Sequence, residues 1–391
     1  MSAVTLRSVD QRRVPDSRAV DAARVAVWRR VRRLLAVRVD NLGDVLMTTP
    51  ALAAAAASVP AMSITLLGGN AATALAPHLP MVDDVIAVRV PWVRHDEQTG
   101  PEDERALIAT LAAGRFDAAV IFTVCTQSAL PAAMICRMAG IPLRLACVRE
   151  NPYGLLTDWV PETDGDLASA RHEVRRQLDL VARVGWSCDD DRLRFALKSA
   201  DVGRVQALLA RERLLGLEVP PVVVHVGATA PSRRWPPERF GSAADLIVQA
   251  CGAPIIFTGS DHEAPLIDAA RAAMRCPSVS LAGRLSLGEL AALIARAGVL
   301  LTNNSGPAHI AAAVGAPIVD LYALTNPQHT PWQVPSRVLN RDVPCRNCLK
   351  SRCAEGHHRC LLDVSPAEAA RAALELLDLD ESTGPSARET G

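Results

Sequence analysis

Short apolar runs alternate with helix-forming segments along most of this chain. Runs of this kind with few polar interruptions are typical of strands that are buried on both faces, and strands that alternate with helices form parallel sheets. In the first half, the predicted strands are residues 34–40, 63–68, 85–90, 117–122 and 143–148. The alternation therefore predicts an α/β protein whose sheets are covered by helices on both sides.

The second half repeats this plan. Its predicted strands are residues 221–228, 254–259, 279–283, 299–304 and 317–323. A chain of 391 residues is long for one hydrophobic core, so two domains joined near residues 200–220 are expected. Two doubly wound, Rossmann-like domains of this kind face a central cleft at the carboxyl ends of their strands, and ligands are expected there.

Composition narrows the class of partner. The 42 basic and 42 acidic residues balance, which provides no overall field for nucleic acid, and only 3% of residues are aromatic. We therefore expect no nucleic-acid partner. The ten cysteines are scattered and no secretory signal opens the sequence, which favours a reducing, cytoplasmic location. The most apolar stretch, residues 51–67, is mostly alanine and is too weak for a membrane span.

Residues 1–33 form a basic N-terminal arm with nine arginines and three aspartates. Between Val20 and Leu35 the apolar residues fall near one helical face, and the arginines lie mostly off it. Two interpretations stay open. The arm packs on the first domain, or its helix lies on an anionic membrane surface, which would give a peripheral association with the cytoplasmic face of the inner membrane.

Three loops at predicted strand ends carry candidate functional residues. In the first, residues 40–52, Gly43 permits a tight turn and Asp44 stands at the start of a helix. A carboxylate at this place can cap the helix by accepting a backbone N–H. It can equally face the cleft and accept a proton from a substrate hydroxyl.

The other two loops suit an anion. In the loop of residues 226–240, Thr229 and Arg233 lie in a basic turn that either binds phosphate or is simply solvated. The third loop, in the sequence TNNSGPAHIAAAVGAPIVDLYA, leads from a strand into a helix through Ser305 and Gly306, whose backbone N–H groups could bind the same phosphates. No GxGxxG or GxxxxGK[ST] motif is present in these loops, so neither a dinucleotide site nor a P-loop is supported.

The combination of VRVDNLGDVLMTTPALAA with TNNSGPAHIAAAVGAPIVDLY resembles the glycosyltransferase family 9 heptosyltransferases. RRWPPERF, FTGSDHE and AGRLSLGELAALIARAG lie between these motifs in the family's order, and the resemblance covers residues 34–375. It implies a GT-B architecture with an acceptor-binding domain at residues 34–205 and a nucleotide-sugar-binding domain at residues 206–375. The acidic segment 376–391 is expected to be a disordered tail.

The resemblance also implies the chemistry. Family members transfer a heptose from an ADP-heptose donor to a hydroxyl with inversion, without a metal at the reaction centre, and lipid-linked core oligosaccharide of lipopolysaccharide is the commonest acceptor. Asp44 matches the general base. The donor-binding positions that follow from the family motifs are Gly43, Thr229, Arg233, Glu263, Asn304, Ser305, Gly306 and His309.

One position departs from the family pattern. Asn304 stands where the family usually has an aspartate in the motif Asn-Asp-Ser-Gly. The change removes a negative charge beside the diphosphate, while the amide can still form hydrogen bonds of similar reach. His309 matches a family histidine near the diphosphate, and a histidine with a purely structural role is the alternative.

A cysteine cluster lies near the end of the second domain, within residues 345–360, with His357 and His358 inside it. Four thiolates can close a tetrahedral zinc or iron site, although only the first CxxC interval is typical of a zinc module. A structural metal and reduced structural thiols both remain open, and neither is required for catalysis. An autotransporter heptosyltransferase branch of the family binds iron through cysteines in a similar segment. The cluster is Cys345, Cys348, Cys353 and Cys360.

Two other functions remain alternatives. A sugar-nucleotide epimerase of GT-B fold would use the same cleft without a separate acceptor. A degenerate, non-catalytic GT-B binding protein would explain the loss of the aspartate at Asn304, but such a protein would have no need of Asp44 and Arg233.

Overall fold

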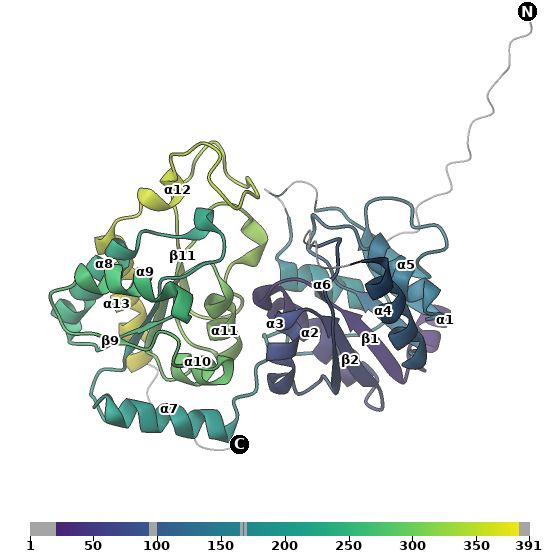
Figure 1. Ribbon diagram of the computed structural model, residues 1–391, viewed down its shortest axis with the longest axis horizontal. Helices are drawn as coiled ribbons and strands as arrows, with labels where there is room; N and C mark the ends of the chain where they lie inside the picture. Colours follow the sequence, from purple (N-terminus) through teal and green to yellow (C-terminus); the bar gives the residue numbers. More distant parts are fainter. Residues whose placement is uncertain (1–20, 94–99, 165–166, 168–169, 383–391) are drawn as a thin grey trace, which may run out of the picture.

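The computed structural model describes residues 21–93, 100–164, 167 and 170–382. Figure 1 shows two α/β bodies side by side, each with helices around a sheet. The strands of the first sheet are all parallel, in the order β3-β2-β1-β4-β5-β6. They are β1 (Arg33–Val37), β2 (Ser63–Gly68), β3 (Asp84–Ala87), β4 (Ala118–Ile121), β5 (Leu143–Val148) and β6 (Asp158–Pro161).

The second sheet has the same topology. Its parallel order is β12-β11-β10-β7-β8-β9, so the order of connections along the chain is that of the first sheet. The strands are β7 (Val222–His225), β8 (Ile255–Thr258), β9 (Val279–Ser280), β10 (Val299–Asn303), β11 (Ile318–Leu321) and β12 (Ser336–Leu339). Both sheets are therefore of the doubly wound Rossmann type, and the predicted α/β class and two-domain plan are confirmed.

Helices cover both faces of each sheet, because alternate residues of each strand enter different cores. In β1, for example, Leu34 and Ala36 pack on one side while Leu35 and Val37 pack on the other. The first domain contains α2 (Leu42–Ser58), α3 (Asn70–Leu75), α4 (Pro101–Ala113), α5 (Leu130–Met138) and α6 (Glu173–Ala182). The later helices are α7 (Ser199–Arg211), α8 (Pro237–Cys251), α9 (Ala264–Ala272), α10 (Leu287–Ile294), α11 (Gly306–Val314), α12 (Arg359–Leu362) and α13 (Pro366–Ser382).

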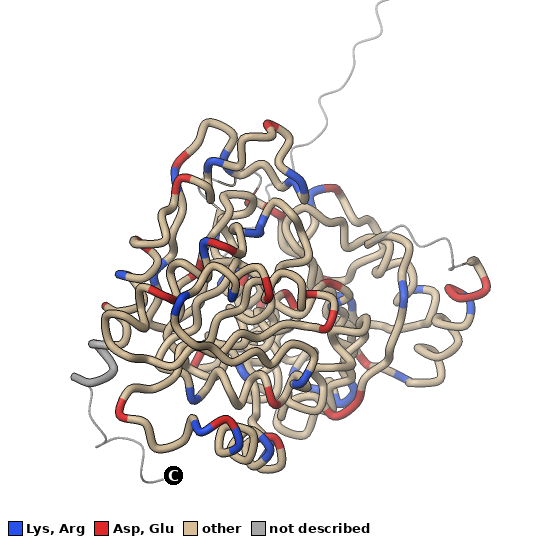
Figure 2. Tube along the Cα trace, turned by 60° about the vertical axis from the view of Figure 1, so that its left-hand side comes forward, with Lys and Arg blue, Asp and Glu red and all other residues tan. Residues whose placement is uncertain are grey.

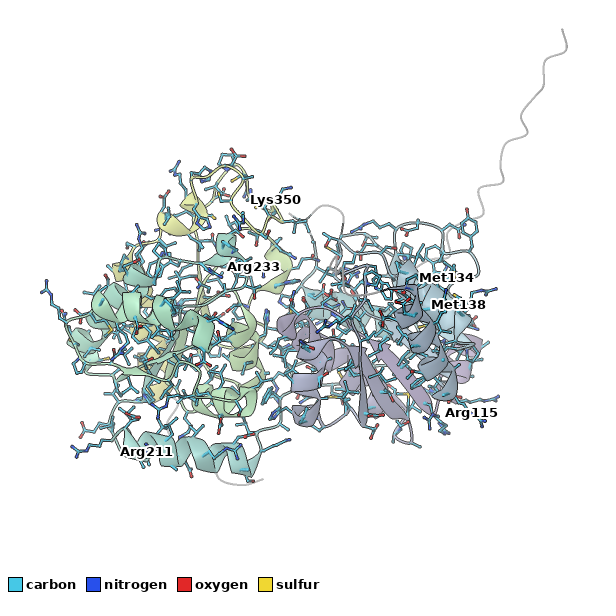
Figure 3. All side chains as sticks on the ribbon, in the orientation of Figure 1. Arg115, Met134, Met138, Arg211, Arg233 and Lys350 are labelled. Carbon is cyan, nitrogen blue, oxygen red and sulfur yellow. The ribbon has the colours of Figure 1, made fainter. Side chains whose placement is uncertain are left out.

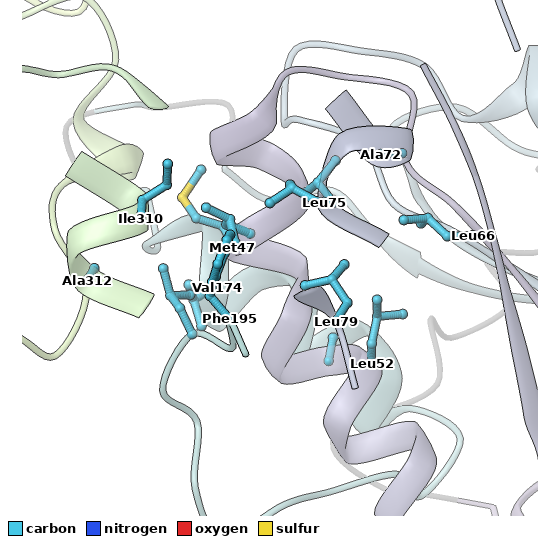
Figure 4. Close-up of a cluster of buried hydrophobic side chains, with 14 of the residues drawn as sticks. Met47, Leu52, Leu66, Ala72, Leu75, Leu79, Val174, Phe195, Ile310 and Ala312 are labelled. Carbon is cyan, nitrogen blue, oxygen red and sulfur yellow. The ribbon is translucent and has the colours of Figure 1, made fainter. Parts of the chain in front are cut away.

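A single hydrophobic cluster crosses the boundary between the domains. It contains Met47 of α2 together with Ile310 and Ala312 of α11, and all three side chains are buried. Figure 4 shows Met47 beside Ile310, with Phe195 near Ala312. Helices α2 and α11 therefore pack against each other, and this contact brings the carboxyl edges of the two sheets to a common cleft.

The basic arm enters the structure through α1 (Ala22–Trp28). The predicted helix ends at Trp28 instead of continuing to Leu35, because the chain turns there and starts the sheet at Arg33. Trp28 is fully buried, lies edge-on to Trp186 at a ring distance of 5.3 Å, and donates to Asp158. The apolar side of α1 at Trp28 is thus covered by the first domain. Residues 1–20 of the arm lie outside the described residues.

The C-terminal segment also differs from the prediction. Helix α13 continues to Ser382, so residues 376–382 are helical and do not belong to a disordered tail. The reason is packing, because Leu376 and Leu377 are buried in the core of the second domain. Residues 383–391 of the expected tail lie outside the described part of the chain. The expected boundary between residues 205 and 206 falls within α7, which pairs with α10 through Arg204 and Glu289.

Charges of both signs are interspersed along the described chain, as Figure 2 shows. Among the described residues, no helix combines the length and the hydropathy that crossing a bilayer requires.

Candidate active site

A cavity of about 600 Å³ lies between the domains at the carboxyl ends of the strands. Its lining comes from both halves of the chain and includes all but one of the residues predicted for catalysis and donor binding. From the first domain it takes Asp40, Asn41, Gly43, Asp44, Val93, Val124, Thr126 and Gln127. From the second it takes residues 228–231 and 349–351 together with Arg233, Asn304, Ser305, Gly306, His309, Asn326 and His329.

Asp44 lies in the first turn of α2, and its side chain is 8% exposed at the cavity. Its Oδ2 accepts the backbone N–H of Asn41 at 3.1 Å, so the carboxylate does cap the helix. Its Oδ1 lies 3.5 Å from Nη2 of the fully buried Arg38. Capping and a position in the cleft are therefore compatible, and together these contacts fix the carboxylate in one orientation.

Behind Asp44 lies a buried network of charges. Arg38 is its centre, with Nη2 at 2.9 Å from Glu173 Oε1 and Nε at 3.2 Å from Asp40 Oδ2. Burial opposes ionisation of Glu173, but Arg38 and Arg176 outweigh it and hold the pKa of this carboxyl below its usual range. At Asp40 burial dominates, and it raises the pKa of that carboxyl despite the nearby guanidinium of Arg38. Arg38 is thus the positioning residue for the acidic side of the cleft.

On the opposite wall, α11 begins with Ser305 as its N-cap and Gly306 as its first residue. Ser305 Oγ and Asn304 Oδ1 are buried and have no hydrogen-bond partner among the described residues. The first N–H groups of a helix also lack intrahelical partners and carry the positive end of the helix dipole. This wall is therefore suited to an anion, as the Ser-Gly turn predicted.

Arg233 and Thr229 stand next to α11 in the cavity lining. Arg233 lies in a short 3₁₀ helix, Pro231–Arg233, and its neighbour Arg234 turns away to donate to the carbonyl of Ala228 at 2.6 Å. Asn303 connects this loop to the start of α11, since its side chain accepts from Trp235 N and donates to Val226 O, each at 2.9 Å. The basic turn is therefore held in place, and only one of its two arginines faces the cavity.

A buried carboxyl on β11 affects this wall. Asp320 is fully buried and neither of its oxygens has a hydrogen-bond partner among the described residues. Burial raises its pKa well above the usual range, an effect that the guanidinium of Arg233 opposes. The carboxyl therefore favours its uncharged form. In that form it does not neutralise Arg233, whose positive charge is available to a bound ligand.

Gly43 and His309 meet across the domain boundary. A Cβ on Gly43 would lie 2.4 Å from His309 Cδ2 and 2.9 Å from Nε2, so only glycine allows the ring to approach this closely. His309 is buried, and burial lowers its pKa to about 3. Its Nδ1 has no hydrogen-bond partner among the described residues. The neutral ring therefore packs between the two domains, and it also lines the cavity.

Glu263 is the predicted donor-binding residue that does not line the cavity. Its carboxylate caps a short 3₁₀ helix by accepting from the N–H of Ser260 at 2.8 Å. It also lies against the backbone of Gly227, at the start of the loop that bears Thr229. The side chain is therefore adjacent to the cleft and is held by local hydrogen bonds.

Other residues of the cavity were missed by the sequence analysis. Asp40 is the last residue of the predicted strand 34–40, and His329 and Asn326 follow β11 in a loop without a recognisable motif. Residues 349–351 belong to the cysteine-bearing segment, whose cysteine spacing indicates a metal site and gives no sign that Lys350 lines the cavity. The usable signal was position, because Asp40, Asn326 and His329 all follow the carboxyl end of a central strand.

The cysteine cluster does not form a metal site in this structure. Within the described residues, no group of three or more histidine, cysteine or acidic side chains is arranged to hold a metal ion. The thiols of Cys345, Cys348, Cys353 and Cys360 are all free. Instead, Cys345 lies 3.7 Å from His357, and Cys353 accepts the N–H of His358. The expectation of structural zinc or iron is therefore not supported, because the side chains bond locally and do not converge on one point.

Two Rossmann-type domains that face a common cleft constitute the GT-B architecture of glycosyltransferases that use sugar nucleotides. Solved structures share it. A glycosyltransferase family 9 protein from Veillonella parvula superposes with a TM-score of 0.73 at 23% identity, covering 89% of this chain and 98% of that one. The ADP-heptose lipopolysaccharide heptosyltransferase II of Escherichia coli gives a TM-score of 0.69 at 23% identity, covering 89% and 99%.

Sequence comparison gives the family. Lipopolysaccharide heptosyltransferase 2 of Escherichia coli K12 is 27% identical over 350 residues, which cover 85% of this chain and 95% of that protein. Glycosyltransferase family 9 (heptosyltransferase) matches residues 104–359, more than half of the chain, and the chain belongs to this family. Membership does not favour the epimerase or the non-catalytic binding protein considered from the sequence.

Proposed function

We propose that this protein transfers a heptose from an ADP-heptose donor to a hydroxyl of a glycan or glycolipid acceptor of the lipopolysaccharide-core type, with inversion. The observation that carries the proposal is that Asp44 and the anion-binding wall of α11 and Arg233 line one cavity from opposite domains. An inverting transfer requires this arrangement, because the base and the leaving group act on opposite faces of the sugar. The similar proteins are named as an ADP-heptose heptosyltransferase and a lipopolysaccharide heptosyltransferase, which supports the same donor and acceptor for this chain.

In the proposed reaction, Asp44 takes the proton of the acceptor hydroxyl while its oxygen forms a bond to the anomeric carbon. The bond from that carbon to the diphosphate breaks, and ADP leaves with the electron pair. Arg233, Thr229 and the N–H groups at Ser305 and Gly306 receive the charge that develops on the diphosphate. In this proposal, groups of the protein supply the positive charge, and the reaction centre requires no metal.

The test is an assay of heptose transfer from ADP-heptose to a lipopolysaccharide-core acceptor, combined with calorimetry of ADP binding. Asp44→Asn should lower kcat by about 10²–10⁴-fold and leave ADP affinity nearly unchanged, because the amide cannot accept the proton. Arg233→Gln should weaken ADP binding. Arg211→Gln is the matched control, since Arg211 lies on α7, far from Arg233 in Figure 3. Transfer at the wild-type rate by Asp44→Asn would overturn the proposed role of Asp44.

We further propose that the protein associates with the cytoplasmic face of the inner membrane and binds a glycolipid acceptor there. The support is charge, because four exposed arginines lie between the end of α1 and the first residue of β1: Arg29, Arg30, Arg32 and Arg33. Since Trp28 is buried, such an association would be electrostatic. Sedimentation with anionic vesicles, compared with neutral ones, tests this. Replacing the four arginines by glutamine should abolish binding to the anionic vesicles, and retention of binding would refute the assignment.

A further inference from the structure

Only two of the 42 basic residues are lysines, Lys198 and Lys350, and one of them lines the cavity. Lys350 belongs to the cysteine-bearing segment, and its neighbours Leu349 and Ser351 line the cavity with it. Figure 3 shows Lys350 above Arg233, on the same domain and beside the first domain. The segment thus extends the anion-binding wall beyond the three loops that the sequence singled out.

The backbone at Lys350 is attached to the turn that carries Arg233. Ser232 Oγ donates to the carbonyl of Lys350 at 2.7 Å, and Ser232 N donates to that of Ser351 at 3.0 Å. Leu349 N donates to Thr325 O at 2.9 Å, which fixes the segment from the other side. His358, from the end of the segment, lies 2.7 Å from Ser232 O. Ser232 directly precedes Arg233 and also bonds to the backbone at Lys350 and Ser351. The backbone at Lys350 is therefore fixed relative to that at Arg233.

The charges of this wall are unpaired. Neither Lys350 nor Arg233 forms an ion pair with a carboxylate of the described residues, and the buried Nε of Arg233 has no hydrogen-bond partner among them. The negative charges of the cavity lining, Asp40 and Asp44, belong to the other domain. A nucleotide sugar carries two negative charges on its diphosphate, and ADP carries three after the sugar has left. Arg233 and a helix N-terminus together provide only about 1.5 positive charges.

We infer that Lys350 binds the diphosphate of the donor together with Arg233, and that the cysteine-bearing segment is part of the donor site. The inference rests on the proposed function, since it assigns a further contact in the same site. The ammonium group is a flexible point charge that can follow the phosphate as its charge increases. It is exposed and has no ion pair with a described carboxylate, so binding a ligand would break no existing pair.

Lysine modification provides the direct test, because Lys198 is an internal control. Lys198 is exposed and precedes α7, outside the cavity. Reductive methylation with formaldehyde and cyanoborohydride, followed by mass spectrometry, reports both lysines separately. Saturating ADP should slow modification of Lys350 by about tenfold and leave Lys198 unchanged, whereas adenosine should protect neither. Equal modification of Lys350 with and without ADP would overturn the inference.

Affinity measurements separate this inference from the proposed function. Lys350→Gln should weaken ADP binding about tenfold, Lys350→Arg should restore most of it, and Lys198→Gln should have no effect. Wild-type protein that fails to bind ADP contradicts the proposed function itself. Wild-type protein that binds ADP, with Lys350→Gln binding equally well, contradicts only the inference. Protection of Lys350 by a phosphorylated acceptor but not by ADP would also overturn it and assign the lysine to the acceptor.

Discussion

The close contact between Gly43 and His309 predicts that Gly43→Ala destabilises the protein when His309 is present and does not when residue 309 is alanine. In Gly43→Ala the new Cβ would lie 2.4 Å from His309 Cδ2, against an ordinary contact of 3.4–4 Å. Displacing a buried ring by about 1 Å costs about 1–3 kcal/mol. Alanine is the better helix former by at most about 1 kcal/mol, so the net effect lies between no change and a loss of about 3 kcal/mol, with a loss of about 1–2 kcal/mol expected.

The assay is thermal unfolding of a double-mutant cycle. Gly43→Ala should lower the midpoint by about 2–4 °C per kcal/mol lost. In the His309→Ala background the same substitution should be neutral or slightly stabilising, because the clash is gone. Gly203→Ala in α7 is the matched control, since nothing lies within 4 Å of its Cβ position, and it should stabilise by about 0.5–1 kcal/mol. Equal destabilisation by Gly43→Ala in both backgrounds would refute the steric argument.

Three further outcomes are expected. The pKa of His309 is about 3 in the folded protein and about 6.5 in the unfolded chain, so the free energy of unfolding falls as pH decreases from 6.5 toward 3. His309→Gln should reduce the slope of unfolding free energy against pH in this range by up to about 1.4 kcal/mol per pH unit, as measured by denaturation at several pH values. Trp28→Ala should cost about 3–5 kcal/mol of unfolding free energy, whereas Val27→Ala, at a side chain that is 40% exposed, should change it by less than about 1 kcal/mol. EDTA should leave the rate of heptose transfer unchanged, and loss of activity that Mg²⁺ restores would contradict the proposed metal-independent centre.

The interior of the fold was predictable because buried parallel strands carry a strong local signal. Residues 63–68 and 143–148 were predicted at the exact bounds of β2 and β5. The edge strands β6 (Asp158–Pro161) and β12 (Ser336–Leu339) were missed, because they are short, largely half-exposed, and contain Asp, Pro, Ser and Arg. The other two edge strands, β3 (Asp84–Ala87) and β9 (Val279–Ser280), lie in apolar runs and were predicted, so it is the polar composition of β6 and β12 that hid them.

The cavity was predictable where a residue lies between a strand and the first turn of the helix that follows it, as Asp44, Arg233 and Ser305 do. The network behind Asp44 was not, since Arg38 and Glu173 are 135 residues apart and meet only through packing. At the cysteine cluster the sequence predicted a site that the structure does not support. A suggestive spacing indicated a metal, whereas the same segment contributes Lys350 to the cavity lining.

The apolar contact between α2 and α11 limits the rotations that the two domains could make against each other. It starts with Gly43 against His309 at the cavity and continues with Met47 and Ile310 in the shared core. The domains also meet where residues 328–332 form hydrogen bonds to Arg171, His172 and Asp191, so a rotation that kept both contacts would pivot along them, beside the cavity. Atoms near a pivot travel least and those at the rim travel furthest. Asp44 and the start of α11 would then keep nearly the same separation, whereas residues 349–351 would move together with the rest of the second domain, to which Ser232 and Thr325 bond them.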